Sequence, residues 1–461
     1  MQEKEPDGAP PRVLAIAEQA NPEFVSVPLE GWSHATALRA FADVHIVTQI
    51  RNRDAFLRAG LVEDEDFTAL DSEALARPLS RLGEGLRGGS GKGWTTVQAF
   101  QTLAYPYFER LVWRRFGADL RAGRFDLVHR ITPLSPIQPS PMARWCRAVG
   151  VPFVLGPLNG GVPWPPGFDR ARRAEREWLS YLRGLYRALP GRGATYRNAA
   201  AVIAGSRHTE TEIPAAARDR TVYIPENGIL PERFSLPPRA APGSPLRASF
   251  VGRLVPYKGC DMLIEAAAPL VAEGRLVLDI VGDGPEMPAL RALVERLGLG
   301  DAVVFHGWRP HGAVQEILVG SDLYAFPSIR EFGGAVVLEA MALGVAPLIV
   351  DYGGPAEHVT AETGFKIPMG DRETIVARLR ERLADLVQRP DDLLSFGRAA
   401  RERVLEKYTW ARKAAMTAAV YDAVLGRRPD WPRFFPEHAE ERPAGPCNPG
   451  RRADDAAAKR G

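Results

Sequence analysis

Short apolar segments rich in β-branched residues alternate with segments of helical periodicity along most of this chain. Strands that are buried on both faces read as continuous apolar runs, and intervening helices imply right-handed parallel crossovers. The sequence predicts strands over residues 12–16, 44–48, 126–129, 152–156, 201–204, 222–224, 248–252, 277–281, 303–305, 323–326 and 346–350. We therefore expect an α/β protein with two consecutive parallel-sheet domains, joined near the proline-rich stretch 231–245.

The last quarter of the chain has a different pattern. Residues 371–388, 392–406 and 410–425 place apolar positions at helical spacing opposite charged faces, which predicts three helices. From Asp430 onward prolines, arginines and alanines dominate, so we expect residues 430–461 to form an extended, frayed tail.

Composition excludes several classes of protein. A chain of 461 residues has room for two domains, and its 59 Lys and Arg against 56 Asp and Glu leave a charge of +3, unlike a nucleic-acid coat. Three scattered cysteines predict neither a disulfide framework nor a zinc site. The start MQEKEPDGAPP does not resemble a secretory signal, and every long apolar run is interrupted by charge. We expect a cytoplasmic protein.

Two segments in the second predicted domain combine glycines with charge. Glu331 precedes a Phe-Gly-Gly turn and Glu339 lies inside the helix that follows, so both carboxylates can face one cleft. The amides of Gly333 and Gly334 would form the helix amino terminus, which favours an anion. Two solvated glutamates on an amphipathic helix are the alternative.

Earlier in the same domain, a strand runs into Gly252 and is followed by Arg253 and Lys258 on a loop before a helix. Open α/β sheets bind ligands at the carboxyl ends of their strands, where two cations suit a diphosphate. Taken singly, each cation is more typical of an ordinary protein surface.

Four ordered blocks, GRLVPYKG, VGDGPE, EFGGAVVLE and DYGGPAE, resemble those of the GT-B family-4 retaining glycosyltransferases (glycosyl transferases group 1). The resemblance is specific over residues 201–420 and looser before them, through FDLVH, GPLNGG, AGSRHTE and IPENG. It implies two Rossmann-like domains facing across a cleft, residues 1–235 on the acceptor side and 246–408 on the nucleotide-sugar side. It also implies a helix over 409–427 that crosses back to the first domain.

The resemblance assigns roles by position. Arg253 and Lys258 would grip the donor diphosphate, Glu339 the ribose hydroxyls and Glu331 the transferred sugar. Backbone and small side chains would also line the donor site, at Gly252, Phe332, Gly333, Gly334, Ala335, Asn227 and Gly31. Cleavage of a glycosyl–phosphate bond leaves negative charge on the diphosphate, so cations and amides placed there stabilise the transition state.

The first domain departs from the family pattern. Many members carry His-x-His after the third-strand block; here His129 matches the first position and Ile131 replaces the second. His129 or Thr132 could substitute, although a buried core histidine is equally consistent for His129. The loop after the first strand, residues 19–34, is long and apolar, and only Gly31 remains of the usual glycine pair.

A basic segment interrupts the first domain. Residues 169–197 contain eight arginines and three acidic residues, which gives the segment a charge of +5. On a helical wheel the apolar residues fall on one side of the segment and the arginines on the other. A helix packed on its own sheet with a solvated basic face is one reading. An element that binds an anionic acceptor or an anionic membrane surface is the other.

The sequence thus predicts transfer of a sugar from a nucleoside-diphosphate sugar to a carbohydrate, lipid-linked or small-molecule acceptor, with retention of configuration and without a metal or other cofactor. Alternatives are a catalytically silent nucleotide-sugar-binding protein and a GT-B phosphorylase, for which we find no recognisable pyridoxal phosphate lysine. A dinucleotide fingerprint starting at Gly282 fails at Met287. Asp64 and Asp66 form a nominal metal motif in a polar stretch that we expect to lack strands, and a solvated acidic turn is the favoured alternative.

Overall fold

Two parallel sheets form the framework of the protein. The structure, a computed structural model, describes residues 9–74, 94–174 and 190–435. The first sheet has the order β3-β2-β1-β4-β5-β6-β7 and the second β10-β9-β8-β11-β12-β13. The strands of the first are β1 (Arg12–Ala17), β2 (Asp43–Gln49), β3 (Phe67–Leu70), β4 (Leu127–Thr132), β5 (Phe153–Leu158), β6 (Ala201–Ala204) and β7 (Thr221–Tyr223). The strands of the second are β8 (Leu246–Val251), β9 (Leu276–Val281), β10 (Val303–Gly307), β11 (Leu323–Phe326), β12 (Ala346–Val350) and β13 (Phe365–Ile367).

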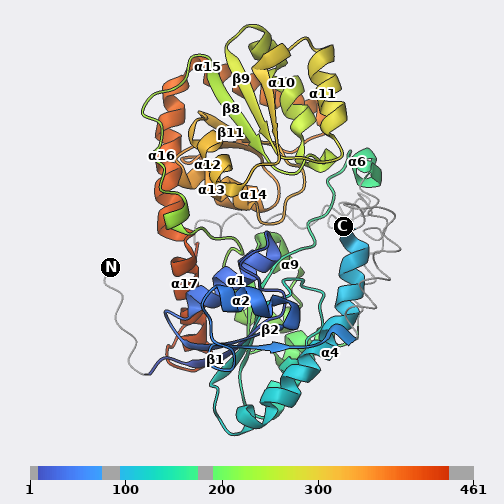
Figure 1. Cartoon of the computed structure of the whole chain (residues 1–461), viewed down its shortest axis with the longest axis vertical. Helices are drawn as coiled ribbons and strands as arrows, with labels where there is room; N and C mark the ends of the chain where they lie inside the picture. Colours follow the sequence, from blue (N-terminus) through green and yellow to red (C-terminus); the bar gives the residue numbers. More distant parts are fainter. Residues whose placement is uncertain (1–8, 75–93, 175–189, 436–461) are drawn as a thin grey trace, which may run out of the picture.

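Each sheet with its helices is called a lobe below, the first lobe around β1–β7 and the second around β8–β13. In the first lobe the helices are α1 (Val27–Leu38), α2 (Arg53–Arg58), α4 (Trp94–Arg121), α5 (Pro141–Ala148), α8 (Arg192–Asn198) and α9 (Arg207–Glu212). The short helix α6 (Asp169–Ala174) follows β5 in the chain but lies beside the second lobe, where it contacts Pro256–Lys258. In the second lobe the helices are α10 (Cys260–Ala272), α11 (Met287–Arg296), α12 (His311–Val319), α13 (Ala335–Ala342), α14 (Gly354–His358), α15 (Arg372–Gln388) and α16 (Pro390–Lys407), after which α17 (Trp410–Val424) ends the helical part. Figure 1 shows the second lobe above the first.

All the strands that the apolar runs predicted are present, with ends that differ by a few residues. The sequence missed β3 and β13, both of which are short edge strands with little apolar pattern of their own. Asp64 and Asp66 lie in a turn, as the alternative to a metal motif predicted, but the stretch does not lack strands, because β3 begins at Phe67 and pairs with β2. Asp66 is bound by Arg39 and by the amide of Val62, so it ends a turn.

The returning helix was predicted correctly. Figure 1 shows α16 alongside the second lobe and α17 continuing along the first. Ala414, Val420 and Tyr421 of α17 are buried in the apolar core of the first lobe. The two chain crossings lie side by side, since the amide of Ile229 donates to Tyr408 and that of Trp410 donates to Ile229. The two segments of chain that connect the lobes therefore run next to each other.

The loop after β1 is shorter than expected. Pro28 lies in the first turn of α1, where its fixed φ suits a helix start, and the helix already contains Gly31. Gly31 packs against Thr132 so closely that an added Cβ would lie 2.6 Å from its methyl group. The helix, rather than a loop, brings Gly31 to the carboxyl end of β4.

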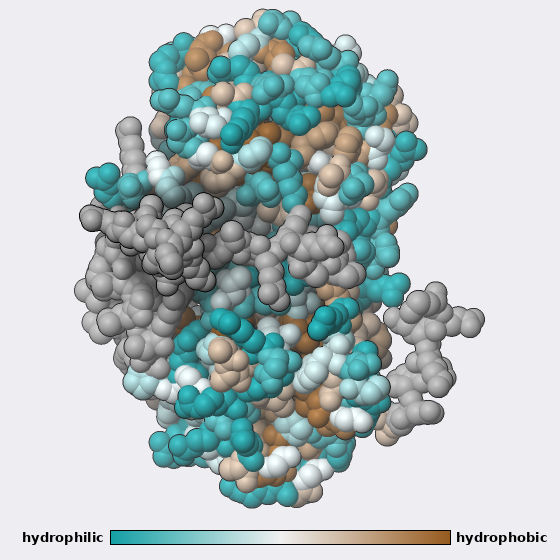
Figure 2. All heavy atoms as spheres, turned by 180° about the vertical axis from the view of Figure 1, so that it is seen from behind, coloured by the Kyte–Doolittle hydropathy of each residue, from teal (hydrophilic) through white to brown (hydrophobic). Residues whose placement is uncertain are grey.

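None of the helices in the described part of the chain is long and apolar enough to cross a membrane. On the face drawn in Figure 2, hydrophilic residues dominate the described surface of both lobes. The final described residues, Trp431–Phe435, lack regular structure, yet Phe435 is buried against Tyr223 and Tyr408. The predicted tail therefore docks at its start, and residues 436–461 lie outside the described residues.

Candidate functional site

The strand order locates a candidate site in the second lobe. Its sheet changes winding direction between β8 and β11, and open α/β sheets bind ligands beyond the carboxyl ends of strands at such a point. Arg253 and Lys258 follow β8, and Glu331 follows β11. Three residues chosen from sequence therefore surround the switch point.

Two loops are bonded together there. The amide of Ile329 and the hydroxyl of Ser328, both after β11, donate to the carbonyl of Tyr257 over 2.9 and 3.2 Å. Gly259 makes the close approach possible, because its φ is +73° and an added Cβ would lie 2.4 Å from the carbonyl oxygen of Pro327. This packing brings the loop after β8 against the loop after β11.

Lys258 and Glu331 form an ion pair across these loops. Their side chains are 16% and 17% exposed, so solvent screens the pair only in part. The Lys258 ammonium also lies 4.9 Å from the centre of the Phe326 ring. The two charges are thus held together, rather than apart as their separate predicted roles imply.

The backbone of Glu331 is supported by the DYGGPAE block. The amide of Gly354 donates to the Glu331 carbonyl over 3.1 Å, and a Cβ on Gly353 would lie 2.3 Å from the same oxygen. Only glycines fit at positions 353 and 354 in this contact, which explains why the DYGGPAE block contains a glycine pair. Glu331 precedes α13 and Glu339 lies in its second turn, as predicted.

The start of α13 meets the first lobe. Gly334 caps the helix with φ +72°, and the carbonyl of Gly333 accepts a 2.6 Å hydrogen bond from His358 Nε2. A Cβ on Gly333 would lie 2.0 Å from Asn227 Nδ2 and 2.3 Å from Glu226 Oε1. Asn227, predicted to line the crevice, is buried at this contact.

The other predicted residues of the second lobe are exposed or only partly buried. Arg253 is exposed just beyond Gly252 at the end of β8. Glu339 lies 3.6 Å from His311 Nε2, with its side chain 21% exposed. The ring of Phe332 lies under the Arg330 guanidinium, 5.1 Å from ring centre to Cζ.

His129 is placed differently from a substrate-binding residue. It is fully buried, its Nδ1 hydrogen-bonds the Tyr421 hydroxyl and its Nε2 hydrogen-bonds the Gly156 carbonyl, each over 2.6 Å. Burial lowers the pKa of His129 to about 4, so the ring is neutral at pH 7. Both ring nitrogens are bonded within the protein, so the structure favours the buried core histidine over the substitute catalytic residue that we considered at His129. Ile131 is buried in the apolar core.

The sequence missed a charged cluster where the lobes meet. Lys413 of α17 is 1% exposed and donates to the Glu226 carbonyl. Burial lowers the pKa of Lys413 to about 7 and raises that of Glu226 to about 7. Glu30 on α1 joins them, and burial followed by repulsion from Glu226 raises its pKa well above the usual range. No sequence spacing links residues 30, 226 and 413.

A second contact between the lobes is centred on Glu357 of α14. Its carboxylate accepts hydrogen bonds from the Arg207 amide and the Tyr223 hydroxyl, each over 2.9 Å. The Arg207 guanidinium lies 3.9 Å above the Tyr223 ring and donates to the Phe435 carbonyl over 3.2 Å. Residues from both lobes and from the start of the tail therefore share one network.

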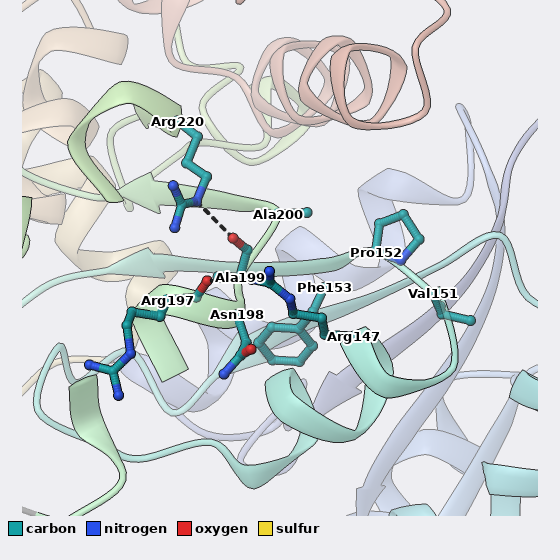
Figure 3. Close-up of a pocket in the computed structure, with 10 residues that line it drawn as sticks. Arg147, Val151, Pro152, Phe153, Arg197, Asn198, Ala199, Ala200 and Arg220 are labelled. Atoms are coloured by element: carbon teal, nitrogen blue, oxygen red, sulfur yellow. Dashed lines mark hydrogen bonds between the residues drawn. The ribbon is translucent and has the colours of Figure 1, made fainter. Parts of the chain in front are cut away.

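A separate surface pocket of about 400 Å³ lies on the first lobe (Figure 3). Pro152 and Ala200, which precede β5 and β6, line it, so it lies at the amino ends of these strands, away from the switch point. Arg147, Arg197 and Arg220 also line it. Arg220 is tied to the Ala199 carbonyl, as the dashed line in Figure 3 shows.

The predicted basic segment is described only in part. Residues 175–189, which include most of its apolar face, lie outside the described residues. Arg192 is 8% exposed and donates to the carbonyls of Pro136 and Glu212, so it belongs to the interior and not to a solvated face. Within the described ranges no group of three or more His, Cys, Asp or Glu side chains could hold a metal ion.

Comparison with known proteins gives one family. The family described as "Glycosyl transferases group 1" matches residues 235–403. A 2-deoxystreptamine glucosyltransferase from Streptomyces kanamyceticus is 30% identical over 360 residues, which cover 76% of this chain and 88% of that enzyme. An alpha-maltose-1-phosphate synthase from Mycolicibacterium smegmatis is 34% identical over 185 residues, 38% of this chain and 47% of its own length.

Solved structures agree on the fold. HepE from Anabaena, in complex with UDP, has a TM-score of 0.59 at 16% identity, with 89% of this chain and 100% of that chain covered. Sucrose-phosphate synthase from Thermosynechococcus elongatus has a TM-score of 0.57 at 19% identity, with 90% and 99% covered. The GT-B arrangement expected from the sequence is confirmed.

Proposed function

The chain belongs to the group 1 glycosyltransferases, and from this premise we propose that it transfers a hexose from a nucleoside-diphosphate sugar to an acceptor hydroxyl, with retention of configuration. The observation that carries the proposal is the Lys258–Glu331 ion pair at the switch point of the second sheet. A cation and a carboxylate side by side suit the two ends of a sugar diphosphate.

Donor binding would exchange the partners of this pair. Lys258, together with Arg253, would bind the diphosphate, while Glu331 would accept hydrogen bonds from sugar hydroxyls. Amides at the start of α13 would add partial positive charge beside the phosphates. Both cations then stabilise the negative charge that grows on the diphosphate as the glycosyl bond breaks.

We propose a front-side mechanism. The bond from the anomeric carbon to the phosphate oxygen breaks, and the acceptor oxygen forms its bond on the same face of the sugar. The acceptor proton passes to an oxygen of the departing diphosphate, which leaves as the nucleoside diphosphate. No metal or other cofactor is needed, so we expect EDTA to leave transfer unchanged. A product of inverted configuration, or a covalent glycosyl-enzyme in a single turnover, contradicts this mechanism.

The partners belong to the same proposal. The relative from Streptomyces kanamyceticus is named a 2-deoxystreptamine glucosyltransferase, which supports a small polyhydroxylated acceptor. HepE was solved with UDP, which supports a uridine nucleotide. An anionic membrane surface stays a candidate partner of the segment 169–197, tested by co-sedimentation with phosphatidylglycerol vesicles against phosphatidylcholine vesicles.

A thermal-shift screen of UDP-, GDP-, ADP- and TDP-sugars tests the proposal, because a ligand that binds only the folded state raises its stability. We expect one nucleotide class to raise the melting temperature and to be consumed when an acceptor panel is added. Binding without turnover across that panel would favour the silent nucleotide-sugar-binding protein. Binding of none of the donors would contradict both functions.

A further inference from the structure

Glu226 belongs to the connector that leaves the first lobe after β7. Its amide donates to the Gly205 carbonyl over 3.0 Å, and its own carbonyl accepts from Lys413 of α17. Lys413 in turn lies 4.2 Å above the Trp410 ring. The backbone of Glu226 is therefore held from two sides by the first lobe and its returning helix.

The side chain of Glu226 nevertheless reaches the second lobe. Its Oε1 atom lies 2.3 Å from where a Cβ on Gly333 would be, and Gly333 lies two residues after Glu331. Real Cβ atoms do not approach an oxygen so closely, so only glycine allows the contact. A carboxylate from one lobe is thereby placed against the candidate donor loop of the other.

Burial and three side chains around Glu226 set its charge. Lys413 and the Asn159 amide favour the ionised carboxylate, whereas Glu331 disfavours it. Burial has the largest effect, and together these influences raise the pKa of Glu226 to about 7. Near neutral pH the group therefore changes between a neutral acid and an ionised acceptor.

A purely structural role explains these features poorly. Two buried charges brought together seldom stabilise a protein more than apolar residues of the same volume. The amide of Asn227 could bridge the lobes without any charge. Ile131 and His129 offer the donor loop no available polar atom, as shown above.

We propose that the Glu226 carboxylate binds a hydroxyl of the transferred sugar, so that the first lobe contributes a donor-specificity residue opposite Glu331. This inference rests on the proposed function, which places the sugar at Glu331, two residues before Gly333. Glu226 then recognises the sugar and not the nucleotide. Lys413 acts through Glu226, as a positioning residue that keeps the carboxylate ionised.

The test compares a nucleoside diphosphate with its sugar conjugate by titration calorimetry, using UDP and UDP-glucose, or GDP and GDP-mannose if the screen selects guanosine donors. We expect Glu226→Gln to weaken binding of the conjugate by about tenfold and to leave binding of the nucleoside diphosphate unchanged, because a charged hydrogen-bond acceptor is replaced by a neutral one. Glu232→Gln, an exposed glutamate on the same connector, is the matched control and should change neither.

A pH series separates recognition from structure. Between pH 6 and 8 the wild-type preference for the conjugate should increase as Glu226 ionises, whereas Glu226→Gln should lack this increase. Ionisation of the free nucleotide is common to both proteins and cancels in the comparison. Lys413→Met should move the midpoint to higher pH, because the Lys413 charge lowers the pKa of Glu226.

An unchanged preference in Glu226→Gln overturns the inference, and so does an unmoved midpoint in Lys413→Met. The second variant decides the question if the first does not fold. Failure of the wild-type protein to bind any nucleotide or conjugate is a different result, since it contradicts the proposed function itself.

Discussion

The Tyr223 hydroxyl donates a 2.9 Å hydrogen bond to the Glu357 carboxylate, and this bond joins the end of the first sheet to α14 of the second lobe. The Arg207 amide donates to the other carboxylate oxygen over the same distance. Burial raises the pKa of Glu357 to about 7, although both hydrogen bonds lower it. Glu357 therefore couples contact between the lobes to pH.

Folding stability should decrease with rising pH because of Glu357. Between about pH 4.5 and 7 the folded protein holds a proton on Glu357 that the unfolded chain has released. The contribution of Glu357 to the free energy of unfolding is therefore fully present below pH 4.5 and is lost as the pH rises through 7. We expect Glu357→Gln to remove this dependence on pH, which amounts to about 3 kcal/mol over the window. Urea unfolding at several pH values measures it, with the exposed Glu362→Gln as the control. An unchanged pH slope in Glu357→Gln would contradict the prediction.

Lys258→Ala should abolish donor binding. It removes the cation proposed for the diphosphate and leaves Glu331 without its ion-pair partner. We expect a loss of at least about a hundredfold in transfer or donor hydrolysis, in the range seen when one charge-stabilising group is deleted. Lys366→Ala, which removes another lysine from an ion pair, with Asp351 at 3.6 Å, should retain activity. Equal activity of the two variants would be evidence against the role of Lys258.

Gly333→Ala tests the contact between the lobes. The new methyl group would overlap Glu226 and Asn227, so the side chains must separate. We expect a loss of about 1–3 kcal/mol in stability together with weaker donor binding. Gly312→Ala, in α12 with no atom within 4 Å of its added Cβ, should be neutral or stabilising by about 0.5–1 kcal/mol. Chemical unfolding and donor titration measure both effects, and similar results for the two alanines would refute the predicted crowding.

His129→Phe should affect stability and not donor affinity. The change leaves the Gly156 carbonyl and the Tyr421 hydroxyl without their hydrogen bonds to the ring, which costs about 1–3 kcal/mol for each group left unsatisfied. The folded pKa of about 4 lies below the ordinary value of 6.5, so stability from the neutral ring is present above pH 6.5 and is lost as the pH falls through 4. This dependence has the opposite sign to that of Glu357. A large loss of donor affinity in a folded His129→Phe protein would restore His129 as the substitute for the second histidine of the family pattern.

Much of the fold could be predicted from the chain because its signals are local. Apolar runs such as residues 201–204 and 323–326 became strands with the predicted ends, and the pattern of residues 410–425 became the helix that returns to the first lobe. A buried strand or an amphipathic helix needs only neighbouring residues to specify it. The edge strands β3 and β13 were not predicted because their apolar patterns are short. They form by pairing with the neighbouring strands β2 and β12.

The residues of the candidate site could be predicted in part from the sequence, but their contacts could not. Lys258 and Glu331 could be chosen from sequence, since glycines and charges at strand ends form compact blocks, but their ion pair could not, because 73 residues separate them. The meeting of Glu30, Glu226 and Lys413 is a property of the tertiary structure alone. Their pKa values shift because the packing of two lobes and a returning helix removes water from three charges at once. Local patterns in the chain suffice to show which residues carry charge and where most strands and helices form. Which of these charges are shielded from water together depends on the tertiary fold, since burial is set by what the rest of the chain places around each group.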